Sequence, residues 1–179
     1  MKKRKIAVFT GNRAEYGLQY PVLKAIDDHP DLDYKLLVSG AHLDENFGGT
    51  VAEIESDGFN INAEIKIEMD AESLYATAQA IGSGVLSISK ALVEMQPDIM
   101  VVYADRFEGF AAVIAASQMN IPTAHIEGGE VSGTIDDTIR HAISKLCHVH
   151  FVGSESAKKR VGKMGEIKKN IFQIGSPDI

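Results

Sequence analysis

The chain has 179 residues, and its 18 Lys and Arg residues against 25 Asp and Glu residues give a formal net charge of −7. Hydrophobic residues make up 45% of the chain and charged residues 24%, close to the globular average. This composition excludes an intrinsically disordered chain, a collagen-like repeat and a coiled-coil rod. The acidic balance also argues against binding to a nucleic-acid backbone, which requires a basic face. One domain of this size buries about 70% of the surface of its unfolded chain, so we expect a single domain over residues 1–179.

The cysteine content and the apolar runs bear on the cellular compartment. The single cysteine, Cys147, excludes a disulfide framework and a cysteine-rich zinc site. The basic residues 2–5 are followed by only five residues, 6–10, before a polar segment, and a signal peptide needs a longer apolar core. No stretch approaches the roughly 18 apolar residues of a membrane span. The sequence therefore predicts a cytoplasmic protein without a membrane partner.

The expected elements alternate between strand and helix along the chain. Short runs rich in Val and Ile, typical of buried parallel strands, cover residues 6–10, 34–39, 60–67, 99–103, 123–126, 149–152 and 171–174. Amphipathic segments predict helices over residues 15–28, 50–57, 71–96, 108–119, 135–146 and 155–163. Gly58 and Pro97 end two of these helices, and Ser154 is a good N-cap for the last one. The alternation predicts an α/β fold with a central parallel sheet.

The segment 71–96 has an unusual composition for a helix that covers a sheet. It carries no charge between Glu72 and Lys90, and small or apolar residues fall on most of its faces. A helix that packs on a sheet is normally polar on its outer side. Two interpretations remain open: the helix is buried under a loop, or it forms an interface between subunits.

Charged residues gather just after the expected strands, where open α/β sheets bind their ligands. These residues are Arg13 and Glu15 after the first strand, His42 after the second, Asp105, Arg106 and Glu108 after the fourth, and Glu127, Glu130, Asp136 and Asp137 after the fifth. Carboxylates suit proton transfer or a hard metal ion, and arginines can hold an anionic part of a substrate. Because the strand ends converge, we expect a site at this edge of the sheet.

Each of these residues also has a purely structural explanation. Asp136 and Asp137 could complement the dipole of the helix that follows them. Asp105 could cap a helix, and Arg106 could pair with Glu108 at the surface. The segment 11–17 has neither the glycine spacing of a dinucleotide site nor the ending of a P-loop. The histidines at 148 and 150 could form a metal pair, but a structural role is favoured since no third ligand is evident.

Three motifs resemble those of the UDP-N-acetylglucosamine 2-epimerase family. They are residues 10–17 (TGNRAEYG), 105–108 (DRFE) and 125–141 (HIEGGEVSGTIDDTIRH), and the last is long and specific. The resemblance is to the hydrolysing branch and extends to Gly175-Ser-Pro177. One position departs from the pattern, because Ala104 stands where a glycine is usual.

The resemblance implies a Rossmann-like domain that forms the amino-terminal half of a two-domain fold, similar to the B-type glycosyltransferases. The carboxy-terminal domain, which supplies most contacts to the uridine diphosphate, is then absent from residues 1–179, and the chain alone is expected to be inactive. The implied partner is a UDP-sugar. A dimer or tetramer is expected through the segment 71–96.

The resemblance also implies a reaction and its residues. UDP is eliminated across C1–C2 of the sugar to give a 2-acetamidoglucal, and water addition then gives a free sugar of the N-acetylmannosamine type. The catalytic positions match Asp105, Glu127 and Asp136, and the substrate-contacting positions match Arg13, His42 and Arg106. The reaction requires neither a cofactor nor a metal ion. Close relatives of the branch act on a 4-acetamido-6-deoxy analogue of the sugar.

Two rival functions fit the same sequence. The first is a half-domain of a glycosyltransferase, which would transfer a sugar to an acceptor. The second is a module without catalysis that binds a sugar nucleotide or serves oligomerisation.

Overall fold

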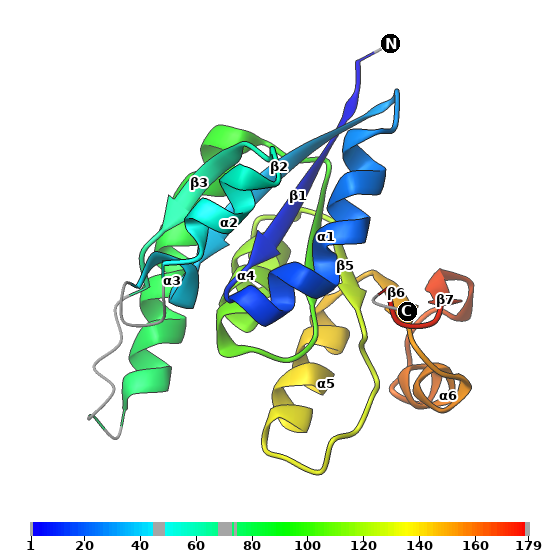
Figure 1. Ribbon diagram of the computed structural model, residues 1–179. Coiled ribbons are helices and arrows are strands. Elements are labelled where there is room, and N and C mark those ends of the chain that lie inside the picture. The colour runs from blue at the N-terminus through cyan, green and yellow to red at the C-terminus, as the bar shows by residue number, and fades with distance from the viewer. Residues whose placement is uncertain (1, 45–48, 68–72, 74, 178–179) are drawn as a thin grey trace.

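A computed structural model describes residues 2–44, 49–67, 73 and 75–177 of the chain. Seven strands form one parallel sheet in the order β3-β2-β1-β4-β5-β6-β7 (Figure 1). The strands are β1 (Arg4–Thr10), β2 (Leu32–Ser39), β3 (Ile61–Ile65), β4 (Ile99–Tyr103), β5 (Thr123–Ile126), β6 (Val149–Val152) and β7 (Ile171–Gln173). All seven expected strands are present, and their parallel pairing confirms the prediction of a Rossmann-like sheet.

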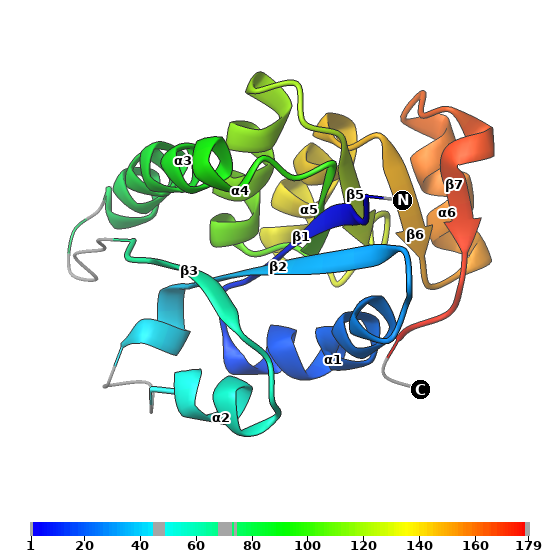
Figure 2. The ribbon, with the colours of Figure 1, turned by 90° about the horizontal axis from the view of Figure 1, so that it is seen from above.

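Helices cover both faces of the sheet, as predicted. Helices α1 (Arg13–Asp27) and α2 (Val51–Ser56) lie on one face, and α3 (Ala76–Met95), α4 (Phe107–Gln118) and α5 (Asp136–Leu146) lie on the other (Figure 2). The last helix, α6 (Glu155–Lys163), packs beside β6 and β7. Its expected N-cap is confirmed, because the Ser154 hydroxyl accepts the backbone N–H of Ala157 at 3.1 Å.

The core is divided between the two faces because successive side chains of a strand point in opposite directions. In β1, Val8 belongs to the cluster under α1, whereas Ala7 and Phe9 belong to the cluster under α3 and α4. All three residues have no solvent-exposed surface. A strand covered on both faces reads as an apolar run rather than as an alternating pattern, which is why the sequence identified it.

The strand order reverses beside β1. From β1 the chain runs outward through β2 to β3, and then α3 returns it to β4 on the other side of β1. Ligands of such sheets bind at this switch point, outside the carboxyl ends of the strands. The candidate residues follow those carboxyl ends. Among the described residues, no helix is long and apolar enough to cross a membrane.

The expected helix over residues 71–96 begins later than predicted. Residues 71, 72 and 74 lie outside the described residues, and α3 starts at Ala76. The Ser73 hydroxyl accepts the backbone N–H of Tyr75 at 3.2 Å, a local turn that competes with the helix. The alternative of burial under a loop is wrong for Leu86 and Val93, which are 66% and 62% exposed.

Candidate active site

The loops after β1 and β2 meet closely at the switch point. Gly40 has a φ of 57°, in the left-handed region that favours glycine. A Cβ atom there would lie 2.6 Å from the carbonyl oxygen of Gly11 and 3.0 Å from Oε1 of Glu108. Ala41 donates its backbone N–H to the same Gly11 carbonyl at 2.9 Å. The absence of a side chain at residue 40 therefore lets both loops pack against α4.

His42 and Arg13 lie on the β1–β2 side of the site. His42 is fully buried, with Nε2 3.0 Å from the Thr10 hydroxyl and Nδ1 2.5 Å from the Thr50 hydroxyl. Burial lowers the pKa of His42 to about 4, so its imidazole is neutral at pH 7. Arg13 begins α1, and its exposed guanidinium forms an ion pair of 2.8 Å with Glu53 of α2. Arg13 thus remains open to a ligand, whereas His42 braces the loop after β2.

Two carboxylates are buried beside the switch point. Oε2 of Glu15 accepts the backbone N–H of Gly11 at 2.7 Å, and Oε1 of Glu15 has no hydrogen-bond partner among the described residues. Burial raises the pKa of Glu15 to about 8, against the smaller effect of the Gly11 N–H. Glu108 accepts two hydrogen bonds from Arg106, at 3.1 and 2.9 Å. The expected Arg106–Glu108 pair is confirmed, but its placement at the surface is wrong, because Glu108 is only 2% exposed.

Asp105 pairs with an arginine from a distant part of the chain. Arg140 of α5 donates from Nη2 to Oδ2 of Asp105, and both side chains are mostly buried. Asp105 follows Ala104, which adopts a φ of 53°, in the left-handed region. Asp105 does not cap α4, because the N-cap residue of that helix is Arg106 and the Asp105 carboxylate is directed to Arg140. Ala104, whose backbone is in the left-handed region, therefore directly precedes the Asp105 carboxylate, which the ion pair with Arg140 holds in place.

The two acids at the start of α5 have different surroundings. Asp137 accepts the backbone N–H groups of Ser132 and Gly133 at 2.8 and 2.9 Å, and these bonds lower its pKa. This carboxylate closes the loop before α5, a structural role different from the helix-dipole role that the sequence suggested. Asp136 is exposed, and its carboxylate accepts only a 3.3 Å hydrogen bond from Thr134 among the described contacts. Asp136 is therefore the acid of this pair that faces solvent.

A buried histidine links β5 to the residues around Asp105. Nε2 of His125 lies 2.6 Å from the carbonyl oxygen of Ala104, and Nδ1 lies 3.0 Å from the Ser144 hydroxyl. Burial lowers the pKa of His125 to about 3, so the ring is neutral and donates from Nε2 to the carbonyl. A Cβ atom on Gly128 would lie 2.7 Å from His125 Nδ1. The ring thus braces the backbone that carries Asp105.

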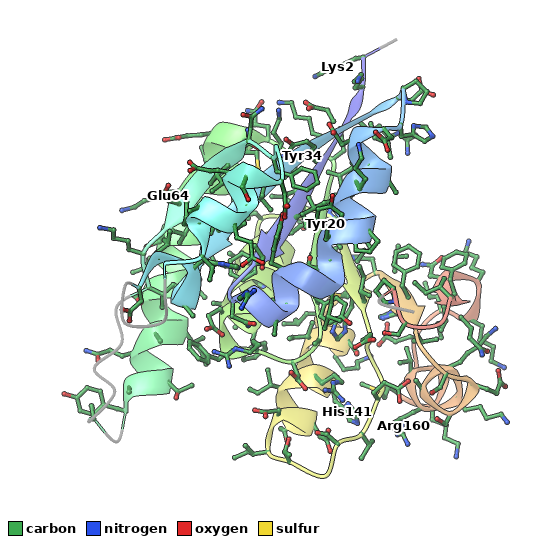
Figure 3. The ribbon with its side chains drawn as sticks, viewed as in Figure 1. Lys2, Tyr20, Tyr34, Glu64, His141 and Arg160 are labelled. Atoms are coloured by element: carbon green, nitrogen blue, oxygen red, sulfur yellow. The ribbon has the colours of Figure 1, made fainter. Side chains whose placement is uncertain are left out.

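Glu127 follows β5 in a left-handed conformation, with a φ of 60°. Its Oε1 accepts a hydrogen bond from the Ser176 hydroxyl, and its backbone N–H donates to the Phe151 carbonyl oxygen at 2.8 Å. Arg160 of α6 holds the same loop through the carbonyl of Gly129. Figure 3 shows Arg160 together with His141 of α5 at the end of the molecule opposite Lys2, which is the end of the strand carboxyl termini.

The predicted site residues fall into three neighbouring groups at this edge. Arg13 and His42 lie on the β1–β2 side, Asp105 and Arg106 lie after β4, and Glu127 lies after β5. The carboxylate of Glu108 raises the pKa of Arg106, and the charges of Glu15 and Asp136 add to this effect. Asp136 is thus within electrostatic reach of Arg106.

Two partners were missed by the sequence reasoning. Arg140 holds Asp105 across 35 residues, and nothing in the local sequence pairs them. Glu15 stands three residues after the N-cap Asn12, a spacing at which a glutamate folds back onto the start of a helix. That spacing could have predicted a bond to the Asn12 N–H, one residue after the Gly11 N–H that Glu15 in fact binds.

A hollow of about 290 Å³ lies at the opposite, amino edge of the sheet, between the start of the strands and the end of α3. Two of its polar side chains already have partners: Lys5 donates to the Met95 carbonyl at 3.0 Å, and Asn62 accepts the Leu36 N–H at 2.8 Å. The carboxyl edge is therefore the better candidate. Within the described ranges, no group of three or more His, Cys, Asp or Glu side chains could hold a metal ion.

Comparisons with known proteins identify the family of the chain. Residues 24–179 match the family model described as UDP-N-acetylglucosamine 2-epimerase. A Legionella pneumophila protein named UDP-N,N'-diacetylbacillosamine 2-epimerase (hydrolyzing) is 44% identical over 98% of this chain and 47% of its own length. The UDP-N-acetylglucosamine 2-epimerase of Neisseria meningitidis serogroup B is 38% identical over 98% of this chain and 46% of its own length.

Solved structures share the fold. A crystal structure of the Neisseria meningitidis UDP-GlcNAc 2-epimerase bound to UDP-GlcNAc superposes with a TM-score of 0.87 at 20% identity, over 98% of this chain and 47% of that one. Another UDP-N-acetylglucosamine 2-epimerase gives a TM-score of 0.89 at 20% identity, over 99% of this chain and 49% of that one. This chain spans about half the length of the relatives it matches. By the family match over most of its length, the chain belongs to the UDP-N-acetylglucosamine 2-epimerase family.

Proposed function

We propose that this chain is the amino-terminal half of a hydrolysing 2-epimerase that acts on UDP-GlcNAc or its 4-acetamido-6-deoxy analogue. The products are UDP and the 2-epimeric free sugar. The observation that carries the proposal is the mostly buried Asp105 carboxylate, paired with Arg140 next to Arg106 at the switch point. The relatives named as hydrolysing epimerases support the reaction type.

The first step is an elimination. A carboxylate removes the proton from C2, the electrons of that bond form the C1–C2 double bond, and the C1–O bond to UDP breaks. The C2 proton is a weak acid, so the base must be held against it, and Asp105, Glu127 and Asp136 are the proposed acid and base groups. Arg13 and Arg106 bind the diphosphate group of the substrate.

The second step reverses the configuration at C2. Water adds at C1 of the 2-acetamidoglucal, and a proton returns to C2 from the face opposite the one that lost it. The resemblance implied that His42 contacts the substrate, but its ring is fully buried between two threonines, so we assign it the role of fixing the loop after β2 instead. Neither step requires a redox cofactor.

Solvent deuterium separates this reaction from its rivals. The complete gene product, incubated with UDP-GlcNAc in D₂O, should release UDP and a 2-epimeric sugar that carries deuterium at C2. Mass spectrometry and NMR of the product measure both results. Sugar transfer to an acceptor without deuterium at C2 would support the glycosyltransferase rival, and binding without turnover would support the module without catalysis. A parallel incubation with the 4-acetamido-6-deoxy analogue identifies the preferred sugar.

A substitution tests the assignment of Glu127. Glu127→Gln keeps the size of the side chain and removes its acid–base function, so turnover in the complete gene product should fall about 10²–10⁴-fold. UDP release is the measurement. The control is Glu64→Gln, at an exposed position of the edge strand β3 (Figure 3). Turnover equal to that of the unsubstituted protein would contradict the assignment.

Two further properties belong to the same proposal. We propose a cytoplasmic location, to which the single buried Cys147 is suited because it needs no oxidising compartment. We also propose a homo-oligomer through α3, whose exposed apolar side chains include Leu86 and Val93. The 179 residues form one folding unit of each subunit.

A further inference from the structure

Glu108 is a buried carboxylate that pairs with Arg106. It lies in the first turn of α4 and is 2% exposed, whereas the side chain of Arg106 is 46% exposed. Two parallel hydrogen bonds join them, from Nε to Oε2 at 3.1 Å and from Nη2 to Oε1 at 2.9 Å. This forked geometry fixes the plane of a guanidinium as well as its position.

The Glu108 carboxylate is itself held in place by the loops after β1 and β2, which approach it at Gly11 and Gly40. A Cβ atom on Gly11 would lie 3.3 Å from Cβ of Glu108, and one on Gly40 would lie 3.0 Å from Oε1 of Glu108. Glu108 therefore has little room to change rotamer. The guanidinium carbon of Arg106 also lies 5.5 Å from the centre of the Phe107 ring, which supports it from a second side.

Two buried glutamates lie near Arg106, and only one of them is ionised at neutral pH. Glu15 is the second buried carboxylate near it, and burial keeps that acid protonated below about pH 8. Of these two buried glutamates, only Glu108 then opposes the positive charge of Arg106. The remaining N–H donors of the guanidinium are available to an anion at the exposed side of the pair.

We propose that Glu108 is a positioning residue that holds the guanidinium of Arg106 against the diphosphate of the UDP-sugar. The inference rests on the proposed function. It follows from the chemistry of that substrate, because the diphosphate carries the formal negative charges of a UDP-sugar, and a guanidinium recognises phosphate oxygens through a fixed fork. Glu108 acts through Arg106 and does not touch the substrate.

A double-mutant cycle in the complete gene product tests this role. The proteins are the unsubstituted enzyme, Glu108→Gln, Arg106→Met and the double variant. Each single substitution should raise KM for the UDP-sugar roughly 10- to 100-fold, the size of a charge-assisted hydrogen bond, and change kcat less than about threefold. The double variant should be no worse than Arg106→Met, because the effect of Glu108 passes through Arg106.

Two additions make the test independent of folding and of helix stability. Arg106→Lys keeps a cation beside Glu108 and provides a second background if Arg106→Met does not fold. Glu155→Gln is the matched control, because Glu155 occupies the first turn of α6, is exposed and pairs with Lys159. The control removes a comparable first-turn charge and should leave KM unchanged.

The affinity for UDP, measured by calorimetry on the same proteins, separates the inference from the proposed function. If the unsubstituted protein binds UDP but releases none from UDP-sugars, the proposed function fails and the cycle is read from the UDP affinities. Independent, additive effects of the two substitutions would overturn the inference, as would a lowered kcat at constant KM. The inference also falls if the unsubstituted protein does not bind UDP.

Discussion

At the scale of single residues, strained backbone marks the candidate site. Four residues other than glycine have a positive φ among those described, and two of them are Ala104 and Glu127. Each such residue costs of order 1 kcal/mol or more, which the surrounding contacts must offset. His125 holds the carbonyl of Ala104, and Ser176 holds the carboxylate of Glu127. The chain thus maintains unfavourable backbone at one proposed catalytic position, Glu127, and directly before another, Asp105, as functional sites often do.

The buried acid Glu15 makes stability depend on pH in a defined direction. Its pKa is raised from 4.5 to about 8 in the folded chain. Below pH 4.5 the Glu15 carboxyl group is protonated in both the folded and the unfolded state, so it does not change the free energy of unfolding with pH. As the pH rises toward 8, the unfolded chain releases the proton while the folded chain keeps it, and the folded state loses stability.

Glu15→Gln removes this pH dependence. The free energy of unfolding of the unsubstituted chain, relative to the variant, should therefore fall between pH 5 and pH 8 by a few kcal/mol at most, since one pKa unit is worth about 1.4 kcal/mol. Urea unfolding at the two pH values measures it. Glu55→Gln, at an exposed position of α2, is the control for loss of a carboxylate. A difference that does not vary with pH would show that Glu15 is ionised throughout.

At the scale of elements, α3 has two unlike sides. Its inner side packs closely on α4, since a Cβ atom on Gly84 would lie 3.0 Å from Cβ of Ala111. Its outer side exposes Leu86 and Val93, which lie seven residues apart and therefore on one stripe of the helix. Tyr75, just before the helix, is 63% exposed as well. Covering such a stripe with a second subunit would remove apolar surface from water.

Leu86→Glu tests the proposed interface. A charge in the centre of an apolar interface is costly to bury, so the variant should sediment as a monomer at concentrations where the unsubstituted chain forms dimers or tetramers. Analytical ultracentrifugation measures this. Ile167→Glu, at a residue 60% exposed outside α3, controls for the loss of a surface apolar group. A monomeric unsubstituted chain, or equal association of both proteins, would contradict an interface at α3.

At the scale of the whole molecule, the candidate residues line one edge of the sheet, and two of their arginines are open to solvent. Arg13 is 72% exposed and Arg106 is 46% exposed, and cations in such positions bind anions weakly because water and salt screen them. The relatives are about twice as long as this chain. A second domain that closes over the edge would exclude water and strengthen these contacts.

The 179-residue chain should therefore fold without catalysing the reaction. We expect one cooperative urea transition, because the sheet and its helices form continuous apolar clusters on both faces. The chain alone should release no UDP from a UDP-sugar above the background, whereas the complete gene product should release UDP steadily. A coupled assay for UDP compares the two proteins at equal concentration. Steady turnover by the chain alone would show that this edge needs no second domain.

The sequence by itself determined the type and order of the elements and the residues at the strand ends. It could do so because buried parallel strands are continuous apolar runs, and the residues after them are local features such as Asp105, Arg106 and Glu127. Helix ends were less certain. The start of α3 was displaced by a turn at Ser73, since short side-chain bonds of this kind compete with helix propensity.

Only the tertiary structure decided which residues meet and which are buried. Arg140 reaches Asp105 from another helix, His42 lies between Thr10 and Thr50, and Glu15 and Glu108 lie inside rather than on the surface. These contacts join segments that are far apart in the chain, and burial depends on which loops pack together at the carboxyl edge. The protonation of a carboxyl group follows from that burial, so no local pattern of residues could predict it.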